Sequence, residues 1–327
     1  SPSSSKSFII KNISRLVTMQ PHPSRLGPLG VIENAAVRVR SGRVVWLGSM
    51  DKLPKAEDRE DVIDACGAVV LPGFIDCHTH LVHGGFRAGE FNERSKGKTY
   101  KEIAAAGGGI MDTVRVTRET SISELKESAT KRLREALSYG TTTIEIKTGY
   151  GLDVKTELKM IDVISELTKE NGPQVFGTFL GAHVIPNEFK NNRSEYLKIL
   201  IDDMMPLLDG TVIKGCDVFV EESAFSKDEA RKIADAAHKQ KLKMHLHVDQ
   251  FGDACGGELS AELGAINASH LDYTSEKGLR AMKDKNVTAV LLPGASFFAG
   301  RGHYPDARKM IEMGLNVAIA TDYNPGT

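Results

Sequence analysis

The chain of 327 residues has few cysteines, few aromatic residues and no long apolar run. None of its four cysteines forms a Cys-x-x-Cys pair, which argues against zinc knuckles and thioredoxin-like chemistry. So few thiols in a chain of this length are typical of a reduced, cytoplasmic protein. No apolar stretch approaches the roughly 20 residues that a membrane-spanning helix needs, so no membrane partner is expected.

An excess of charge of either sign is also missing. The sequence has 42 Lys and Arg against 43 Asp and Glu, and its net charge is -1. A nucleic-acid partner would require a basic surplus, so none is expected. Hydrophobic residues make up 41% of the chain, which is enough for a sizeable core. Residues 1–6 lack the apolar core of a signal peptide and are expected to form a disordered tail.

The order of the apolar runs predicts a small β domain followed by an α/β barrel. Short β runs separated by turn residues indicate the N-terminal half of a small β domain over 7–71. From 72 to 327, eight short β runs alternate with helical patterns, which predicts a (β/α)8 TIM-type barrel of about 250 residues. A doubly wound sheet is the competing architecture, but it would be expected to carry a glycine-rich loop after its first strand. The chain stops just after the eighth β run, so we expect a fragment that lacks the last helix.

The motif Cys77-His78-Thr79-His80 follows the apolar run 69–76, which we interpret as a buried strand. Residues two apart in a strand point to the same side, so His78 and His80 could hold one metal ion together. Taken alone, the motif could equally be two exposed histidines on a loop. Cys77 would point away from this pair and is interpreted as a core residue.

The ends of the other predicted strands decide between these alternatives, because barrel chemistry lies at the carboxyl ends of the strands. Five of the ten histidines follow such ends, and Asp322 follows the eighth; these histidines are His78, His80, His183, His247 and His270. Three imidazoles and one carboxylate suit a divalent metal with an open position, and His78, His80, His247 and Asp322 supply this set. His245 competes with His247, but it lies about 7 Å back along the same strand face and is expected to be a buried histidine.

The run 71–80 resembles the opening metal motif of the amidohydrolase superfamily. Further stretches resemble imidazolonepropionases, a family within it, at 84–87, 100–110, 145–153, 178–183 and 321–327. The His-x-His motif is shared by many amidohydrolases, whereas the middle stretches are more specific. The resemblance covers nearly the whole chain beyond the tail.

The resemblance implies one divalent or trivalent ion, zinc or iron, at His78, His80, His247 and Asp322. It implies that the cyclic amide C–N bond of 4-imidazolone-5-propanoate is hydrolysed to N-formimidoyl-L-glutamate, a step of histidine degradation. The implied catalytic residues are Asp322, His270 and Gln250. The implied substrate contacts are Arg87, Tyr150, His183, Gln250, Asn324, Gly326 and Thr327. Some relatives carry Glu in place of Gln250, and an amide cannot transfer protons as a carboxylate can, so an acid/base role for this residue is open.

Two other functions remain as alternatives. A nucleobase deaminase would share the metal ligands but would not use Arg87 to bind a carboxylate. A catalytically silent barrel could serve as a binding or structural protein, although the intact ligand set argues against it.

We assign no metal role to Glu221 and expect His83 to be a packing residue. Residues 107–109 are expected to be a hinge before a helix, and an exposed barrel flank would allow a homodimer.

Overall fold

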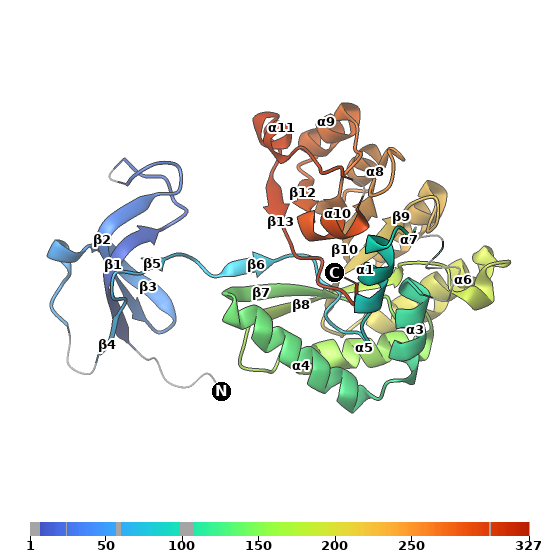
Figure 1. Ribbon diagram of the computed structural model, residues 1–327, viewed down its shortest axis with the longest axis horizontal. Helices are drawn as coiled ribbons and strands as arrows, with labels where there is room; N and C mark the ends of the chain where they lie inside the picture. Colours follow the sequence, from blue (N-terminus) through green and yellow to red (C-terminus); the bar gives the residue numbers. More distant parts are fainter. Residues whose placement is uncertain are drawn as a thin grey trace. The chain divides into compact units, whose positions relative to one another are not determined.

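The computed structural model describes residues 7–23, 25–56, 60–98, 102, 108–300 and 302–326. The chain divides into two compact units between Gly73 and Phe74 (Figure 1). The predicted tail over 1–6, Thr327 and most of the stretch 100–107 lie outside the described residues. In the part of the chain that is described, no helix is both long and apolar enough to cross a membrane.

The first unit is a mixed five-stranded sheet. Its strands are β1 (Phe8–Val17), β2 (Val31–Arg40), β3 (Arg43–Ser49), β4 (Asp61–Asp64) and β5 (Val69–Val70), and a 3-10 turn, η1 (Met50–Lys52), follows β3. The order is β3-β2-β1-β4, with β5 also pairing with β1. Ser41 and Gly42, both with positive φ, join β2 to β3 in the two-residue turn that suits a twisted hairpin. Ile13, Leu16, Ala35 and Val37 form the small core.

The second unit is the predicted barrel of eight parallel strands in sequential order. They are β6 (Phe74–Asp76), β7 (Thr141–Lys147), β8 (Gln174–Ala182), β9 (Ile213–Val220), β10 (Lys243–Val248), β11 (Asn267–His270), β12 (Thr288–Leu291) and β13 (Val317–Ile319). Beyond the ends of β6 and β13 the chain forms a bridge between Thr79 and Tyr323. The His80 N–H donates to the Tyr323 carbonyl at 2.8 Å, so the barrel is closed where the His-x-His motif lies.

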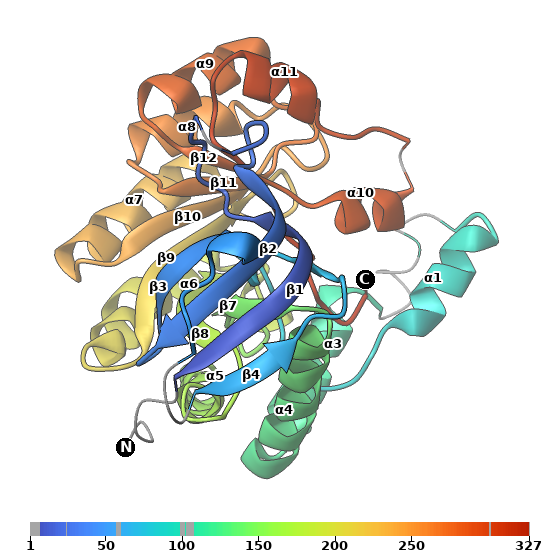
Figure 2. The same cartoon turned by 90° about the vertical axis from the view of Figure 1, so that its left-hand side faces the viewer.

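Helices cover the outside of the barrel (Figures 1 and 2). Those that pack on the strands are α4 (Ile122–Ser138), α5 (Val154–Leu167), α7 (Lys227–Lys239), α8 (Gly256–Glu262), α9 (Glu276–Asp284) and α11 (Ala307–Glu312). Capping boxes begin α4 at Ser121 and α7 at Ser226. The helical segment between β8 and β9 is three pieces: α6 (Arg193–Lys198), the π-helical η3 (Ile199–Met204) and the 3-10 turn η4 (Met205–Leu208). Pro206 in this last turn lacks an N–H donor.

Three short elements at the carboxyl end of the barrel were not predicted: α1 (Ala88–Ser95), η2 (Asn187–Phe189) and α10 (Pro293–Ala299). The helix expected after residues 107–109 is α3 (Ile110–Glu119). Gly109, with φ of 78°, directly precedes α3, and Gly107 lies outside the described residues. These elements carry several of the residues that line the site.

The expectation that the run 69–76 is buried is wrong, and the run forms two strands, one in each unit. Val69 and Val70 form β5 of the small sheet, whereas Phe74–Asp76 form β6 of the barrel. Pro72 and Gly73 separate the two strands, and Pro lacks the N–H that a central strand must donate. Phe74 and Ile75 are more than half exposed, and only Asp76 is buried. Asp76 links the first and last strands of the barrel, because its carboxylate accepts hydrogen bonds from the N–H and the hydroxyl of Thr321, which follows β13.

Candidate metal centre and substrate pocket

Four buried side chains converge at the carboxyl ends of the strands. Oδ1 of Asp322 lies 3.6 Å from Nε2 of His78 and 3.4 Å from Nε2 of His80. Nε2 of His247 lies 3.5 Å from Nε2 of His80. The ligand atoms fall into two triplets that share His78, and within each triplet all atoms lie within 4.8 Å of one another. One triplet is His78, His80 and Asp322, and the other is His78, His247 and His270.

These residues fit a metal ion. Nε2 of His78 is buried and has no hydrogen-bond partner among the described residues. Burial, reinforced by Lys147 and the neighbouring imidazoles, holds the pKa of His78 far below its usual range, so its ring is neutral and can ligate. Burial is also the main cause that holds the pKa of His80 far below its usual range. A cation bound by these imidazole nitrogens would satisfy polar atoms that are otherwise buried without partners.

The outer nitrogens of two of these rings are held by side chains of neighbouring strands. Nδ1 of His78 lies 2.9 Å from the Ser269 hydroxyl. Nδ1 of His247 lies 3.0 Å from Oδ1 of Asp217, and an N–H donated there leaves Nε2 as the ligand. Lys147 contacts the other oxygen of Asp217 at 2.8 Å and Glu145 at 2.7 Å. This network orients the His247 ring through Nδ1, the nitrogen that faces away from the other ligand atoms.

The Lys147–Asp217 pair keeps its charges although it is buried. Burial alone would raise the pKa of Asp217, but His247 and Lys147 outweigh it and hold this pKa far below its usual range. Burial alone would lower the pKa of Lys147, but Asp217 and Glu145 raise it. This pair was not predicted from the sequence, although an ionisable residue inside an apolar strand is a usable signal.

The backbone is left-handed at two of the converging residues. His270 has φ of 75° and Asp322 has φ of 50°, a region that costs free energy for residues other than glycine. Burial lowers the pKa of His270 to about 3, so its ring is neutral. His270 belongs to one ligand triplet, whereas the resemblance implied a place beside the metal for it. The geometry therefore brings a fourth imidazole within 4.8 Å of the ligand atoms of His78 and His247.

A cavity of about 120 Å³ opens above the converging ligands. Its lining includes His80, His247, His270 and Asp322 together with Arg87, Tyr150, His183, Gln250 and Asn324, all implied by the resemblance. It also includes residues that the sequence reasoning missed, among them Glu90, Arg94, Phe219, Phe251 and Phe298. Residues implied as metal ligands and residues implied as substrate contacts therefore line the same cavity.

Tyr150 and His183 form one wall of the 120 Å³ cavity, which we call the inner cavity. The His183 ring stacks on His80 at 5.2 Å between centroids, and Tyr150 lies 5.3 Å from His183. Nδ1 of His183 lies 2.9 Å from the Gly149 carbonyl, which can only accept a hydrogen bond. Burial holds the pKa of His183 far below its usual range, so Nδ1 carries the one proton of a neutral ring. Nε2 of His183 is therefore a hydrogen-bond acceptor.

Arg87 and the last described residues form another part of the wall. The side chain of Arg87 is 9% exposed, and its Nη1 lies 3.5 Å from Glu90. The Arg87 N–H donates to the Pro325 carbonyl at 2.8 Å. A Cβ added at Gly326 would lie 3.1 Å from Nη2 of Arg87, so this residue approaches the guanidinium closely. The Asn324 amide bonds within its own turn, to the Asp322 carbonyl and the Gly326 N–H.

Gln250 lies on the loop after β10, and Glu221 holds the backbone of this loop. Oε1 of Glu221 accepts the N–H of Gln250 at 2.7 Å and that of Phe251 at 3.0 Å. Glu221 is in neither ligand triplet. Its carboxylate instead fixes the loop that brings Gln250 to the cavity.

The remaining histidines expected to be structural lie apart from the ligand triplets. A Cβ on Gly215 would approach Nε2 of His245 to 2.6 Å, so this ring packs against the backbone of the neighbouring strand. Burial lowers the pKa of His245 to about 4. His83 is buried, and its Nδ1 lies 3.0 Å from the Gly85 carbonyl. Cys77 packs against a small apolar cluster around Val290.

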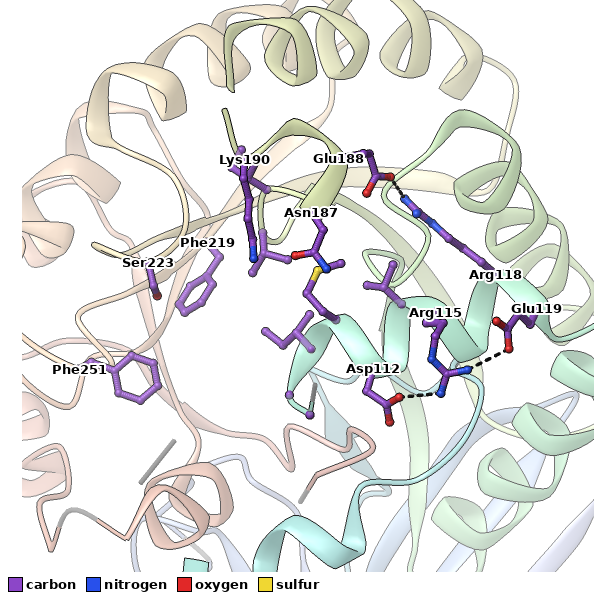
Figure 3. Close-up of a pocket in the computed structure, with 17 residues that line it drawn as sticks. Asp112, Arg115, Arg118, Glu119, Asn187, Glu188, Lys190, Phe219, Ser223 and Phe251 are labelled. Atoms are coloured by element: carbon purple, nitrogen blue, oxygen red, sulfur yellow. Dashed lines mark hydrogen bonds and ion pairs between the residues drawn. The ribbon is translucent and has the colours of Figure 1, made fainter. Parts of the chain in front are cut away.

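A larger outer cavity of about 690 Å³ adjoins the inner one (Figure 3). The two share Ile110, Phe219 and Phe251 in their linings. In Figure 3, Lys190 and Asn187 lie between the two phenylalanines and the ion pairs of α3. Arg115 pairs there with Asp112 and Glu119, and Arg118 pairs with Glu188; these charges are already neutralised.

Comparison with known families agrees with the geometry. The profile of the amidohydrolase family matches residues 69–326. The imidazolonepropionase of Alkaliphilus oremlandii is 43% identical over 326 residues, which cover 97% of this chain and 77% of that protein. The imidazolonepropionase of Clostridium tetani is also 43% identical, with 98% of this chain and 78% of that protein covered.

Solved structures with the same fold are more distant in sequence. A guanine deaminase from C. acetobutylicum with bound guanine superposes with a TM-score of 0.65 at 16% identity, covering 98% of this chain and 75% of that one. A triazine hydrolase variant superposes with a TM-score of 0.71 at 16% identity, covering 98% and 72%. At such identities the likeness shows the fold alone.

Proposed function

Because the chain belongs to the amidohydrolase family, as an imidazolonepropionase-like, metal-dependent member of it, we propose that it hydrolyses 4-imidazolone-5-propanoate to N-formimidoyl-L-glutamate. The bond broken is the cyclic amide C–N bond. One observation carries the choice of substrate: Arg87 lines the same small cavity as the converging imidazoles. A guanidinium binds a carboxylate through two parallel hydrogen bonds, and the propanoate tail supplies that carboxylate.

We propose His78, His80, His247 and Asp322 as ligands of one zinc or iron ion. Imidazole and carboxylate suit both metals. When bound, such an ion polarises a carbonyl and lowers the pKa of a water ligand from about 15.7 to about 7. The described residues supply what surrounds this chemistry: they hold the substrate, move protons and exclude bulk water.

Asp322 is the proposed base. Its carboxylate lies among the imidazoles and takes a proton from the water that attacks the ring carbonyl carbon. As the C–N bond breaks, the same carboxyl returns the proton to the leaving ring nitrogen. His270, neutral because of burial, lies beside it and orients the water or stabilises the developing oxyanion.

The other lining residues orient the substrate. Nε2 of His183, an acceptor, suits a ring N–H, and the Tyr150 ring packs beside it. Gln250 and Asn324 offer amide groups, and Gly326 allows a close approach to Arg87. We propose that Gln250 positions the substrate by hydrogen bonds and transfers no proton. Thr327, also implied as a substrate contact, lies outside the described residues.

A hydrolysis assay tests this function. The purified protein, loaded in turn with zinc and iron, is incubated with 4-imidazolone-5-propanoate, guanine or cytosine, and mass spectrometry identifies the products. We expect N-formimidoyl-glutamate from the first compound only. Turnover of guanine or cytosine alone would support a nucleobase deaminase, and metal-free, inactive protein would support a silent barrel. The better metal is the one that gives the higher rate.

The cysteines support a cytoplasmic location for this reaction. Cys66, Cys77, Cys216 and Cys255 are all free thiols, as in proteins of reducing compartments. We propose the cytoplasm on that basis, and fractionation of the source cells tests it.

A further inference from the structure

Glu157 is a buried carboxylate that bonds to the backbone of a pocket loop. It lies in the first turn of α5 and is 2% exposed. Its Oε1 accepts the N–H of Gly151 at 2.8 Å and of Leu152 at 3.0 Å. Both of its oxygens lie 3.2 Å from the N–H of Gly149. One side chain therefore satisfies three backbone donors within four residues.

The loop needs such a partner to keep its shape. Gly149 has φ of 104° and Leu152 has φ of 54°, so the chain turns through two left-handed positions. A Cβ on Gly149 would come within 2.7 Å of the Leu180 carbonyl, and one on Gly151 would come within 2.6 Å of the Glu157 N–H. The loop is thus pressed between β8 and α5, where water cannot replace a lost hydrogen-bond partner.

The same loop reaches two walls of the inner cavity. The Gly149 carbonyl accepts the N–H of His183 and so sets which nitrogen of that ring faces the cavity. Tyr150, between the clamped residues, lies 5.6 Å from the His80 ring and lines the cavity. Glu157 itself is not among the residues that line the cavity.

We propose that Glu157 is a positioning residue for substrate binding: its carboxylate fixes the loop 148–152, and through that loop it places Tyr150 and orients His183. This inference rests on the proposed function, because it concerns how the same cavity binds its substrate. The contacts that hold His78 and His247 go to Ser269 and Asp217, and the loop reaches the proposed ligands only where Tyr150 and His183 pack on the His80 ring, so metal affinity should change much less than substrate affinity. Glu157 thus acts on the affinity for substrate and leaves the metal in place.

The substitution Glu157→Gln tests the proposal, because it replaces one acceptor oxygen by an NH2 group that faces backbone donors. We expect KM for 4-imidazolone-5-propanoate to rise about 10- to 100-fold, the range for one lost hydrogen bond to a charged group. kcat and the zinc affinity, measured by chelator competition, should change much less. Glu166→Gln is the matched control, because Glu166 is on the same helix but pairs with Lys126 and Lys169 outside the cavity.

A second variant and a double-mutant cycle separate positioning from a general loss of structure. Gly151→Ala adds a Cβ that would lie 2.8 Å from Oε1 of Glu157, so it disturbs the same contact if Glu157→Gln does not fold. It should raise KM with metal retained. Combined with Tyr150→Ala, Glu157→Gln should cost less in kcat/KM than it does alone.

The outcomes are distinct for the two proposals. If the unsubstituted protein does not hydrolyse 4-imidazolone-5-propanoate, the proposed function fails. If it does, but both Glu157→Gln and Gly151→Ala keep the original KM, the role of Glu157 is overturned. It is also overturned if metal affinity falls in step with activity, or if the effects of Glu157→Gln and Tyr150→Ala simply add.

Discussion

The metal half and the substrate half of the pocket are held in place by different contacts. In the metal half, side chains hold side chains: Ser269 contacts His78, and Asp217 contacts His247. In the substrate half, carboxylates hold backbone: Glu157 bonds to the loop of Tyr150, and Glu221 to the loop of Gln250. A change in the first half should therefore act on the metal, and a change in the second on substrate affinity.

The difference follows from where each half lies on the barrel. The proposed ligands lie at or just past strand ends, where neighbouring strands bring side chains within contact, so one partner side chain is enough to orient each ring. The proposed substrate contacts lie on loops whose backbone N–H groups have no strand neighbour. Buried N–H groups must find acceptors, and a carboxylate can accept several at once.

The largest expected effect comes from His247→Ala. It removes one proposed ligand and leaves Lys147 and Asp217 without the imidazole that faces them. We expect metal occupancy and turnover both to fall to background, which elemental analysis and the hydrolysis assay would measure on the same sample.

His245→Ala is the control for that result, because His245 lies on the same strand but outside the ligand triplets. It should leave the metal content per folded protein unchanged. If His245→Ala empties the site and His247→Ala does not, the two histidines have been assigned the wrong way round.

A smaller effect on the metal is expected from Asp217→Asn. The amide oxygen can still accept the His247 N–H, but the charge that pairs with Lys147 is lost. Substitution of such outer partners typically lowers metal affinity or activity about 10- to 100-fold. We expect a loss in this range by chelator competition, with KM unchanged for the protein that remains loaded.

Asp235→Asn, at an exposed position of α7, is the matched control for Asp217→Asn and should have no effect. A rise in KM without loss of metal affinity in Asp217→Asn would break the division between the two halves, because a metal-side contact would then act on substrate.

The barrel and the proposed ligands could be predicted because both depend on local patterns. Apolar runs alternating with helical patterns indicate parallel strands, and strand ends collect at one edge whatever the loops do. His78, His247 and Asp322 could be found by reading the residues at those ends. Contacts set by the register of separate strands could not be found in this way, and the pairing of Lys147 on β7 with Asp217 on β9 is an example.

The loops resisted prediction for a related reason. The short helices α1 and α10 have eight and seven residues, which is shorter than the window in which a helical apolar pattern can be recognised. The shape of the loop 149–152 depends on Glu157, which belongs to the following helix and reads in the sequence as an ordinary helical glutamate. Tyr150 could therefore be named from the family resemblance, whereas what holds it required the structure.

Among substitutions in the substrate half, Arg87→Gln should raise KM the most. Loss of a charge-assisted contact to the propanoate predicts a rise in KM of about 10- to 100-fold, with metal affinity unchanged. Steady-state kinetics and chelator competition measure the two quantities. Arg87→Lys should restore only part of the affinity, since an ammonium lacks the two-pronged geometry.

Arg115→Gln is the control for Arg87→Gln, because Arg115 lines the outer cavity and already pairs with Asp112 and Glu119. Its KM should stay as it was. If Arg87→Gln lowers metal content instead of raising KM, the guanidinium supports the metal half and the comparison between the halves fails at this residue.

The smallest effect is expected from Gln250→Ala. Glu221 bonds to the backbone N–H of Gln250, which remains in the variant, so the loop should keep its place. Only the hydrogen bonds of one neutral amide to the substrate are lost, each worth about 0.5–1.5 kcal/mol, so kcat/KM should fall less than about tenfold per bond. The pH profile of kcat/KM should not move, because an amide does not ionise in this range. A much larger loss, or a shifted profile, would mean that Gln250 takes part in proton transfer after all, and the substrate half would then share in the chemistry that we assign to Asp322.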